Sequence, residues 1–208
     1  MIQLLDYKKS YDGVLVLQVP QFDIPPGQHL ISGANGTGKT TLLKSIAGII
    51  PYEGSISIDG VKDSRTNAIA YRASVRYSPA EPAFPNFIKG GDMLNLYQAI
   101  LPTDSKDFNR VNSLLGVDKF QNRKIGHYSS GMLKKLSLAL AFMGDSKLII
   151  LDEPYNALDM DACSALDELI KEFVSRGKSF LMTSHQDITG WDWDMHLQIK
   201  NHQILLCE

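Results

Sequence analysis

A glycine-rich loop is the strongest chemical signal in the sequence. Residues 33–40 read Gly-Ala-Asn-Gly-Thr-Gly-Lys-Thr, which matches the P-loop pattern GxxxxGK[ST]. Glycines in such a loop let backbone N–H groups converge on phosphate oxygens, and the helix that follows directs the positive end of its dipole at the same phosphates. By average residue usage, a chance match is expected in roughly one percent of chains of this length. The pattern therefore predicts a nucleotide site.

The loop pattern assigns roles to individual residues. Lys39 is expected to reach the β- and γ-phosphates, and the Thr40 hydroxyl is expected to ligate Mg²⁺. The residues expected to bind the nucleotide along this segment are Gly33, Ala34, Asn35, Gly36, Thr37, Gly38, Lys39, Thr40 and Thr41.

Two adjacent carboxylates follow the most apolar segment of the chain. Residues 148–151 read Leu-Ile-Ile-Leu and are followed directly by Asp152 and Glu153. A nearly continuous apolar run is typical of a strand in a buried parallel sheet. Asp152 would hold the Mg²⁺ shell opposite Thr40, and Glu153 lies where a carboxylate polarises an attacking water.

The elements that would position these residues alternate between strands and helices. Strands are expected within 2–24 and over 29–33, 54–60, 74–79, 147–154, 178–185, 196–200 and 203–207. Helices are expected over 40–50, ended by Pro51, over 93–101 and 108–115, divided by Pro102, and over 129–143 and 160–176. This alternation predicts an α/β fold with a mainly parallel sheet. The first strands and the last hairpin break the alternation and predict an antiparallel addition.

Composition limits the classes of protein that the chain can belong to. Its 208 residues suit one domain, and 44% hydrophobic with 21% charged residues indicate a soluble globular protein. The net charge of −2 argues against a general nucleic-acid binder, which carries a basic excess. Cys163 and Cys207 have no CxxC spacing, so we expect neither a disulfide framework nor a zinc site, and a reducing compartment fits. No signal peptide is visible, and the longest apolar stretch, 136–143, is far shorter than the roughly 20 residues that span a bilayer.

The remaining motifs resemble those of the ATP-binding cassette (ABC) ATPases. Residues 128–132, Tyr-Ser-Ser-Gly-Met, are similar to the LSGGQ signature, and 156–159, Asn-Ala-Leu-Asp, are similar to the D-loop. His185 after an apolar strand resembles the H-loop histidine, and Tyr11 stands where an aromatic ring stacks on adenine. Tyr7 is an alternative to Tyr11, and in a third interpretation both rings belong to the core. The motifs occur in the order and with the spacing of the family over essentially the whole chain.

The resemblance implies a fold and an assembly. The fold is that of a P-loop NTPase with a parallel core sheet, an antiparallel β subdomain and an α-helical subdomain. Residues 1–208 would form a single cassette with the helical subdomain at about 82–145. Two cassettes would form a head-to-tail dimer with two ATP molecules between them. Ser129, Ser130 and Gly131 would touch the ATP held by the partner, and Asp159 would link the two sites.

The resemblance also implies catalytic roles. Lys39 would bind the phosphates, Glu153 would be the general base for water, and His185 would contact the γ-phosphate. One position departs from the family: after the strand at 74–79, the usual glutamine of the Q-loop is replaced by Ala80. Either Glu81 takes over the contact with Mg²⁺, or the coupling at this position is altered.

The family usually works with a membrane-spanning permease, which here must come from another chain. The resemblance implies an ATPase subunit on the cytoplasmic face of the membrane, paired with itself or with a paralogous ATPase, without nucleic acid as a partner. The Gly-Met end of the signature is typical of exporters. The alternatives are a soluble ABC ATPase that acts on a non-transport macromolecule and a small-molecule kinase.

Three further features have simpler interpretations. Lys134 and Lys135 are interpreted as a solvated helix face, and Trp191 and Trp193 are interpreted as packing residues. Ser129 is expected to cap the helix that follows it.

Overall fold

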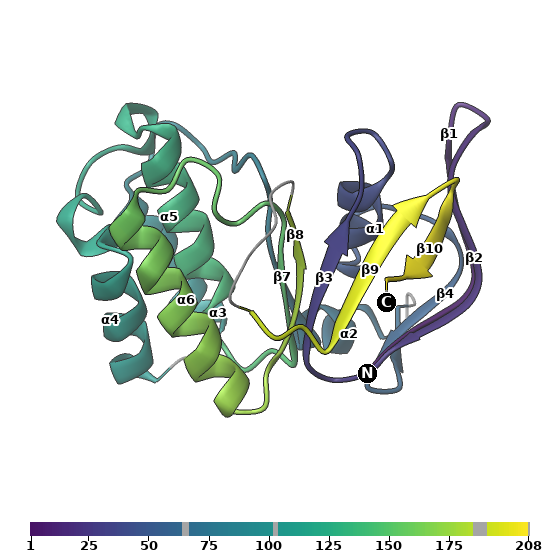
Figure 1. Ribbon diagram of the computed structural model, residues 1–208. Coiled ribbons are helices and arrows are strands. Elements are labelled where there is room, and N and C mark those ends of the chain that lie inside the picture. The colour runs from purple at the N-terminus through teal and green to yellow at the C-terminus, as the bar shows by residue number, and fades with distance from the viewer. Residues whose placement is uncertain (64–66, 102–103, 185–190, 208) are drawn as a thin grey trace.

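The strands form two sheets in the computed structural model, which describes residues 1–63, 67–101, 104–184 and 191–207 (Figure 1). The larger sheet has the order β10-β9-β3-β8-β7-β6; neighbours from β9 to β6 run parallel, whereas β10 pairs antiparallel with β9. Its strands are β3 (Gln28–Ser32), β6 (Val75–Ser78), β7 (Leu148–Leu151), β8 (Ser179–Thr183), β9 (Met195–Lys200) and β10 (Gln203–Leu206). The predicted α/β fold with a mainly parallel core sheet is confirmed.

The smaller sheet is antiparallel and has the order β2-β1-β4-β5. Its strands are β1 (Ile2–Tyr11), β2 (Val14–Ile24), β4 (Glu53–Ile58) and β5 (Val61–Lys62). Asp12 and Gly13, the two residues between β1 and β2, have φ angles of 49° and 80°, as the tight turns of hairpins require. This turn fixes Tyr11 at the end of β1. The antiparallel addition predicted from the first strands is therefore a separate sheet, whereas the last hairpin extends the parallel one.

The helices lie mostly on one side of the larger sheet (Figure 1). They are α1 (Lys39–Ile46), α2 (Ala68–Ser74), α3 (Gly90–Ile100), α4 (Ser105–Leu114), α5 (Ser130–Ala141) and α6 (Met160–Ser175), with the 3₁₀ turns η1 (Val117–Lys119) and η2 (Ile125–His127). Helices α3 to α6 gather beside β7 and β8, and α1 lies on the side of the antiparallel sheet. The sequence patterns assigned no element to α2. None of the helices in the described ranges is long and apolar enough to cross a membrane.

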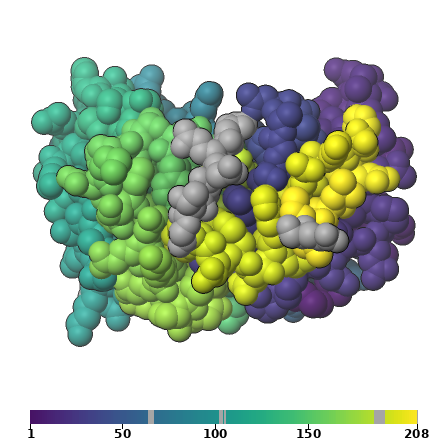
Figure 2. All heavy atoms as spheres, viewed as in Figure 1, coloured from purple at the N-terminus to yellow at the C-terminus, as the bar shows by residue number. Residues whose placement is uncertain are grey.

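The parallel sheet divides two hydrophobic cores. Along β7, Leu148 and Ile150 point into a core that α1 and the antiparallel sheet complete, whereas Ile149 and Leu151 point into a core formed with α3, α5 and α6. Successive side chains of a strand point to opposite faces, so a strand covered on both faces must be apolar throughout. Figure 2 shows the outer surface of the same two halves, helices in teal to green beside strands in purple and yellow.

Helix α1 ends earlier than predicted, and Pro51 is not the cause. The helix ends at Ile46, and Gly48 has a φ angle of 66°. The Gly48 N–H donates to Ser45 O over 3.0 Å, and the Ile49 N–H donates to Lys44 O over 2.9 Å. These two bonds form a Schellman cap, which needs a residue that adopts the left-handed conformation without strain. The prediction that Pro51 stops this helix was wrong because a glycine stops it first.

Candidate nucleotide site

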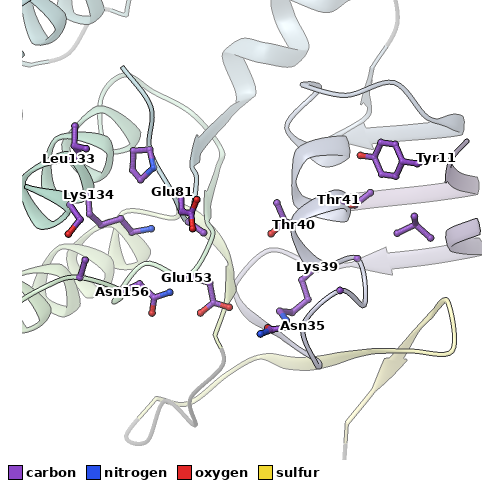
Figure 3. A pocket seen from close by; sticks show the side chains of 17 residues that line it. Tyr11, Asn35, Lys39, Thr40, Thr41, Glu81, Leu133, Lys134, Glu153 and Asn156 are labelled. Carbon is purple, nitrogen blue, oxygen red and sulfur yellow. The ribbon is translucent and has the colours of Figure 1, made fainter. Parts of the chain in front are cut away.

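A cavity of about 730 Å³ lies where the parallel strands β3, β6 and β7 end (Figure 3). Ligands of open α/β sheets bind at the carboxyl ends of the strands. The lining residues come from two sides: Tyr11, Val16, Asn35, Gly36, Gly38, Lys39, Thr40 and Thr41 on one wall, and Ala80, Glu81, Pro82, Ser130, Leu133, Lys134, Glu153, Asn156 and Ala157 on the other. We call these the P-loop wall and the α5 wall.

The P-loop wall comes mainly from the loop between β3 and α1 and the start of α1, and Tyr11 and Val16 add to it from β1 and β2. Gly33 has a φ angle of 148°, and a Cβ atom there would meet the Thr37 Oγ1 at 2.9 Å and the Ile199 carbonyl at 3.0 Å. The glycine is therefore required by both its backbone angle and the close approach of β9. The Lys39 ammonium, 7% exposed, donates to Gly33 O at 2.6 Å and to Ala34 O at 3.1 Å. Burial lowers the pKa of Lys39, while Glu153 and Asp152 act in the opposite direction.

Asp152 connects several strand ends through its carboxylate. Its Oδ2 accepts hydrogen bonds from the Thr40 hydroxyl at 2.8 Å and the Tyr77 hydroxyl at 3.1 Å, and its Oδ1 accepts from Thr183 Oγ1 at 2.7 Å. The carboxylate is 1% exposed. Burial raises the pKa of Tyr77, with Asp152 adding to the effect, so this hydroxyl keeps its proton as a donor. Hydroxyl and carboxylate oxygens together are the hard donors that Mg²⁺ prefers, so the residues fit this ion.

Glu153 has an unusual backbone conformation next to this network. Its φ angle is 47°, which costs a non-glycine residue on the order of 1–3 kcal/mol. The Glu153 N–H donates to Thr183 Oγ1 at 2.9 Å, which holds the strained residue against β8. Its side chain lines the α5 wall opposite Lys39 (Figure 3).

The α5 wall contains a buried lysine, so one interpretation of the sequence was wrong. Lys134 was expected on a solvated helix face, but it is 1% exposed, and its Nζ donates to Pro79 O at 2.9 Å and to Asp152 O at 2.8 Å. Burial lowers the pKa of Lys134 to about 8, although Asp152 and Glu153 act in the opposite direction. Lys135 is partly exposed, with 19% of its side chain accessible, and its ammonium pairs with the Asp159 carboxylate at 2.7 Å.

The two tyrosines near the loop have different environments. Tyr7 is completely buried, and its hydroxyl lies 2.9 Å from Ser45 Oγ, so it belongs to the core. Tyr11 is 48% exposed and lines the P-loop wall. The Lys9 ammonium lies 4.5 Å from the centre of the Tyr11 ring and donates to Pro51 O at 2.7 Å. Of the two rings, Tyr11 is thus the one that a base in this cavity can reach.

The signature segment mostly lines a second cavity of about 610 Å³. Ser129 caps α5 as predicted, with its Oγ accepting from the Met132 N–H at 3.2 Å. Ser129, Gly131 and Asp159 line this second cavity and not the first, whereas Ser130 borders both. A Cβ atom on Gly131 would lie 2.7 Å from the Ala157 carbonyl, so the helix start and the D-loop segment are in close contact.

Similarity to known proteins identifies the family of this chain. The sequence model of the ABC transporter family matches residues 17–156. The chain belongs to the ABC transporter family. A lantibiotic transport ATP-binding protein, SrtF of Streptococcus pyogenes, is 28% identical over 187 residues, 89% of this chain and 80% of that protein. A Nod factor export ATP-binding protein I of Burkholderia pseudomallei is 33% identical over 194 residues, which cover 88% of this chain and 62% of that protein.

A solved structure shows the same fold. A dimeric ATP-binding cassette in a post-hydrolysis state, with bound ADP and phosphate, superposes with a TM-score of 0.85 at 19% identity, covering 98% of this chain and 96% of that one. The ABC ATPase fold expected from the sequence is therefore confirmed. This ABC cassette is an ATP-binding subunit and an ATPase.

The cassette brings most of the predicted site residues together. Gly33, Ala34 and Thr37 shape the P-loop without lining the cavity, and Asp152 lies directly behind Thr40. Glu81 lines the α5 wall, on the other side of the cavity from Thr40 (Figure 3). His185 lies outside the described residues.

Sequence reasoning missed several lining or supporting residues of the cassette. Tyr77 has no motif, because its contact with Asp152 depends on the pairing of β6 with β7. Lys134 had a signal: it shares a helix face with Ser137, Leu138 and Ala141 at i+3, i+4 and i+7, and this face is buried. Trp191 and Trp193 pack against the helical core, as expected.

Proposed function

We propose that this cassette couples hydrolysis of Mg²⁺·ATP to export by a separate membrane permease. The observation that carries the proposal is that the residues predicted to bind nucleotide are divided between two cavities. The first holds the P-loop, Thr40 and Glu153, whereas Ser129 and Gly131 lie in the second. A second cassette in head-to-tail orientation would bring its signature segment to the first cavity.

The residues of the first cavity have complementary roles in the proposed reaction. Lys39 would leave its loop carbonyls for the β- and γ-phosphates, and Tyr11 would stack on the adenine. Thr40 and Asp152 would hold Mg²⁺, with Glu81 from the opposite wall. The ion would neutralise charge on the phosphate oxygens. Glu153 would accept the proton of the attacking water.

Residues at the dimer contact complete the proposed mechanism. Ser129, Ser130 and Gly131 would bind the γ-phosphate of the ATP on the partner, where the start of α5 offers free N–H groups and a positive dipole end. Asp159 would connect the two sites, and His185 would contact the γ-phosphate. The γ-phosphate is present before hydrolysis and absent after it, so it can shift the balance between closed and open dimers.

Replacing Glu153 with Gln tests the site. We expect ATP binding to persist, hydrolysis to fall by roughly 10²-fold or more, and an ATP-dependent dimer to appear on size exclusion. Glu53→Gln, an exposed change on β4, is the matched control and should retain wild-type turnover. Wild-type turnover in Glu153→Gln would remove this residue from the mechanism.

A groove between the sheet and the helices is the proposed contact for the permease. It encloses about 280 Å³ between β6, α3 and α5 and includes Arg76, Phe84 and Tyr97. On α3, Leu96 and Ile100 are 52% and 65% exposed, so this helix presents apolar surface beside the groove. Such surface is typical of interaction sites. The helical region at about 82–145 would therefore be the part that transmits motion to the membrane.

A charged residue in the groove tests this contact. Ala83 is exposed and lines the groove, so Ala83→Arg adds bulk and charge without removing a core side chain. We expect this variant to hydrolyse ATP normally but to lose co-purification with a membrane protein from detergent-solubilised membranes. Ala70→Arg on α2 is the control and should keep the partner. Recovery of soluble partners alone would favour the non-transport alternative.

The export direction and the location follow from the proposed partner. A Nod factor export protein is among the relatives, and the Gly131-Met132 end of the signature agrees with this direction. The cassette would bind the permease at the cytoplasmic face of the membrane, as a homodimer or with a paralogous ATPase. Accumulation of a substrate outside cells, dependent on an intact Lys39, is the expected transport result; uptake would reverse the direction.

A further inference from the structure

The Lys134 side chain joins three segments that are distant in the sequence. It originates in the first turns of α5, and its single ammonium donates to Pro79 O, after β6, and to Asp152 O, after β7. Ser137, one turn further along α5, adds a second connection, because its Oγ lies 2.8 Å from Ser78 Oγ. The start of α5 is thus attached by buried polar contacts to the ends of two neighbouring strands.

The ammonium is placed among the groups of the ATP site. Lys134 lines the same cavity as Lys39, from the opposite wall, and its amine points into the cavity (Figure 3). The carbonyl that it binds belongs to Asp152, the residue directly before Glu153. A shift of this carbonyl would rotate the backbone of Glu153, whose φ angle of 47° already depends on support from neighbours.

The loop after Pro79 is connected to α5 through its backbone. Ala80 carries only a methyl group, and Pro79 has no N–H, so the Pro79 carbonyl is the polar group through which α5 holds the loop. A buried carbonyl needs a donor, and a buried ammonium needs acceptors. Lys134 satisfies both requirements with one side chain.

We propose that Lys134 is a positioning residue for ATP hydrolysis. Its side chain connects residues 79–81 to the end of β7 and thereby keeps Glu153 aligned with the bound nucleotide. The hydrogen bond from Lys134 to the Pro79 carbonyl takes the place of a contact that the methyl group of Ala80 cannot make. Movement of α5 relative to the sheet is then passed to Glu153 through the carbonyl of Asp152. The proposal rests on the role proposed above for Glu153 as the general base.

Three substitutions at this position test the proposal. Lys134→Met removes the donors. Lys134→Gln replaces the ammonium with a neutral amide donor on a side chain one atom shorter, which cannot reach both carbonyls. Lys134→Arg keeps the charge and several donors. Lys62→Met, an exposed change on β5, is the matched control. The measurements are kcat, KM for ATP, melting temperature and amide exchange at Ala80 and Glu81.

We expect Lys134→Met to lower kcat by roughly 10- to 100-fold, as small misalignments of a reacting group do. KM for ATP should stay near that of the wild type, because the P-loop wall supplies the nucleotide contacts. Lys134→Gln should be intermediate, Lys134→Arg should recover most of kcat, and amide exchange at Ala80 and Glu81 should accelerate in Lys134→Met. Lys62→Met should match the wild type in every measurement.

Two results would overturn the proposal. The first is wild-type kcat in Lys134→Met. The second is an equal loss of kcat in all three variants, accompanied in each by a lower melting temperature. That result would show that Lys134 has a purely structural role. If Lys134→Met does not fold, Lys134→Gln decides: reduced kcat at unchanged KM supports the proposal, and wild-type kcat refutes it.

The outcome can be separated from a failure of the proposed site. Wild-type turnover in Glu153→Gln would refute the assignment of the general base itself. An inactive Glu153→Gln combined with a fully active Lys134→Met would refute only the role of Lys134.

Discussion

The two walls of the cavity beside the P-loop each present a buried lysine, but the two lysines reach their partners in different ways. Lys39 on the P-loop wall binds carbonyls that lie five and six residues away along the chain. Lys134 on the α5 wall binds carbonyls that lie 18 and 55 residues away. The contacts of Lys39 are therefore local to one loop, whereas those of Lys134 form only after the strands and α5 have assembled.

This difference predicts separate roles for the two walls, nucleotide binding for the P-loop wall and control of turnover for the α5 wall. Contacts between residues of one loop change little when distant segments move relative to one another. A wall made from distant segments changes when those segments move relative to one another. Substitutions on the P-loop wall should therefore alter nucleotide affinity, and substitutions on the α5 wall should alter turnover.

The largest effect is expected from Lys39→Met on the P-loop wall. Loss of a charged donor to the phosphates should lower ATP hydrolysis by roughly 10²- to 10³-fold and weaken ATP binding as well. Hydrolysis assays and equilibrium nucleotide binding measure the two effects. A variant that kept wild-type affinity for ATP would contradict the assignment of binding to this wall.

A smaller effect on affinity is expected from Tyr11→Ala. Stacking of an aromatic ring on a base contributes about 1–3 kcal/mol, so KM for ATP should rise roughly tenfold while kcat changes little. Tyr11→Phe keeps the ring and is the control, with KM near that of the wild type. Equal KM values in Tyr11→Ala and the wild type would remove the ring from the nucleotide site.

Ser129→Ala should affect stability through the start of α5. Removal of the cap leaves the Met132 N–H without its acceptor and should lower the free energy of unfolding by about 1 kcal/mol. Chemical denaturation of the nucleotide-free protein measures this effect separately from catalysis. Ser113→Ala, an exposed change on α4, is the control and should leave the denaturation midpoint in place. An unchanged midpoint in Ser129→Ala would show that the cap contributes nothing to α5.

The smallest effect is expected from Lys135→Met, next to the critical lysine. The ion pair with Asp159 is partly exposed, with 19% and 62% of the two side chains accessible, and such pairs contribute about 0–1 kcal/mol. Denaturation should show a smaller loss of stability than in Lys134→Met, which removes the lysine donor from the buried Asp152 carbonyl and from the partly buried Pro79 carbonyl. A larger loss of stability in Lys135→Met than in Lys134→Met would contradict the greater contribution assigned to the buried lysine.

The sequence predicted the local parts of this structure well. The loop at 33–40, the apolar strand before Asp152 and the cap at Ser129 each depend on contacts within a few residues, so their patterns were sufficient. The fold class also followed, because strands buried on both faces must be apolar.

The remaining features depend on contacts that no short pattern records. Tyr77 reaches Asp152 because β6 and β7 are neighbours, and Lys134 is buried because α5 packs against the ends of these strands. The end of α1 was misplaced for another reason: Gly48 and Pro51 both end helices, and the glycine comes first in the chain. The α2 helix has a single fully buried residue, Tyr71, and so has little hydrophobic pattern to detect.

The hydroxyl groups around Asp152 have a consequence for how the molecule senses its ligand. Tyr77 belongs to β6, Thr183 to β8 and Thr40 to the helix that follows β3, and all three donate to the carboxylate at the end of β7. Four adjacent strands of one sheet therefore share a single anionic centre, and that sheet separates the two hydrophobic cores. Arrival or loss of a cation at the Asp152 carboxylate therefore changes the charge within the sheet that both hydrophobic cores share.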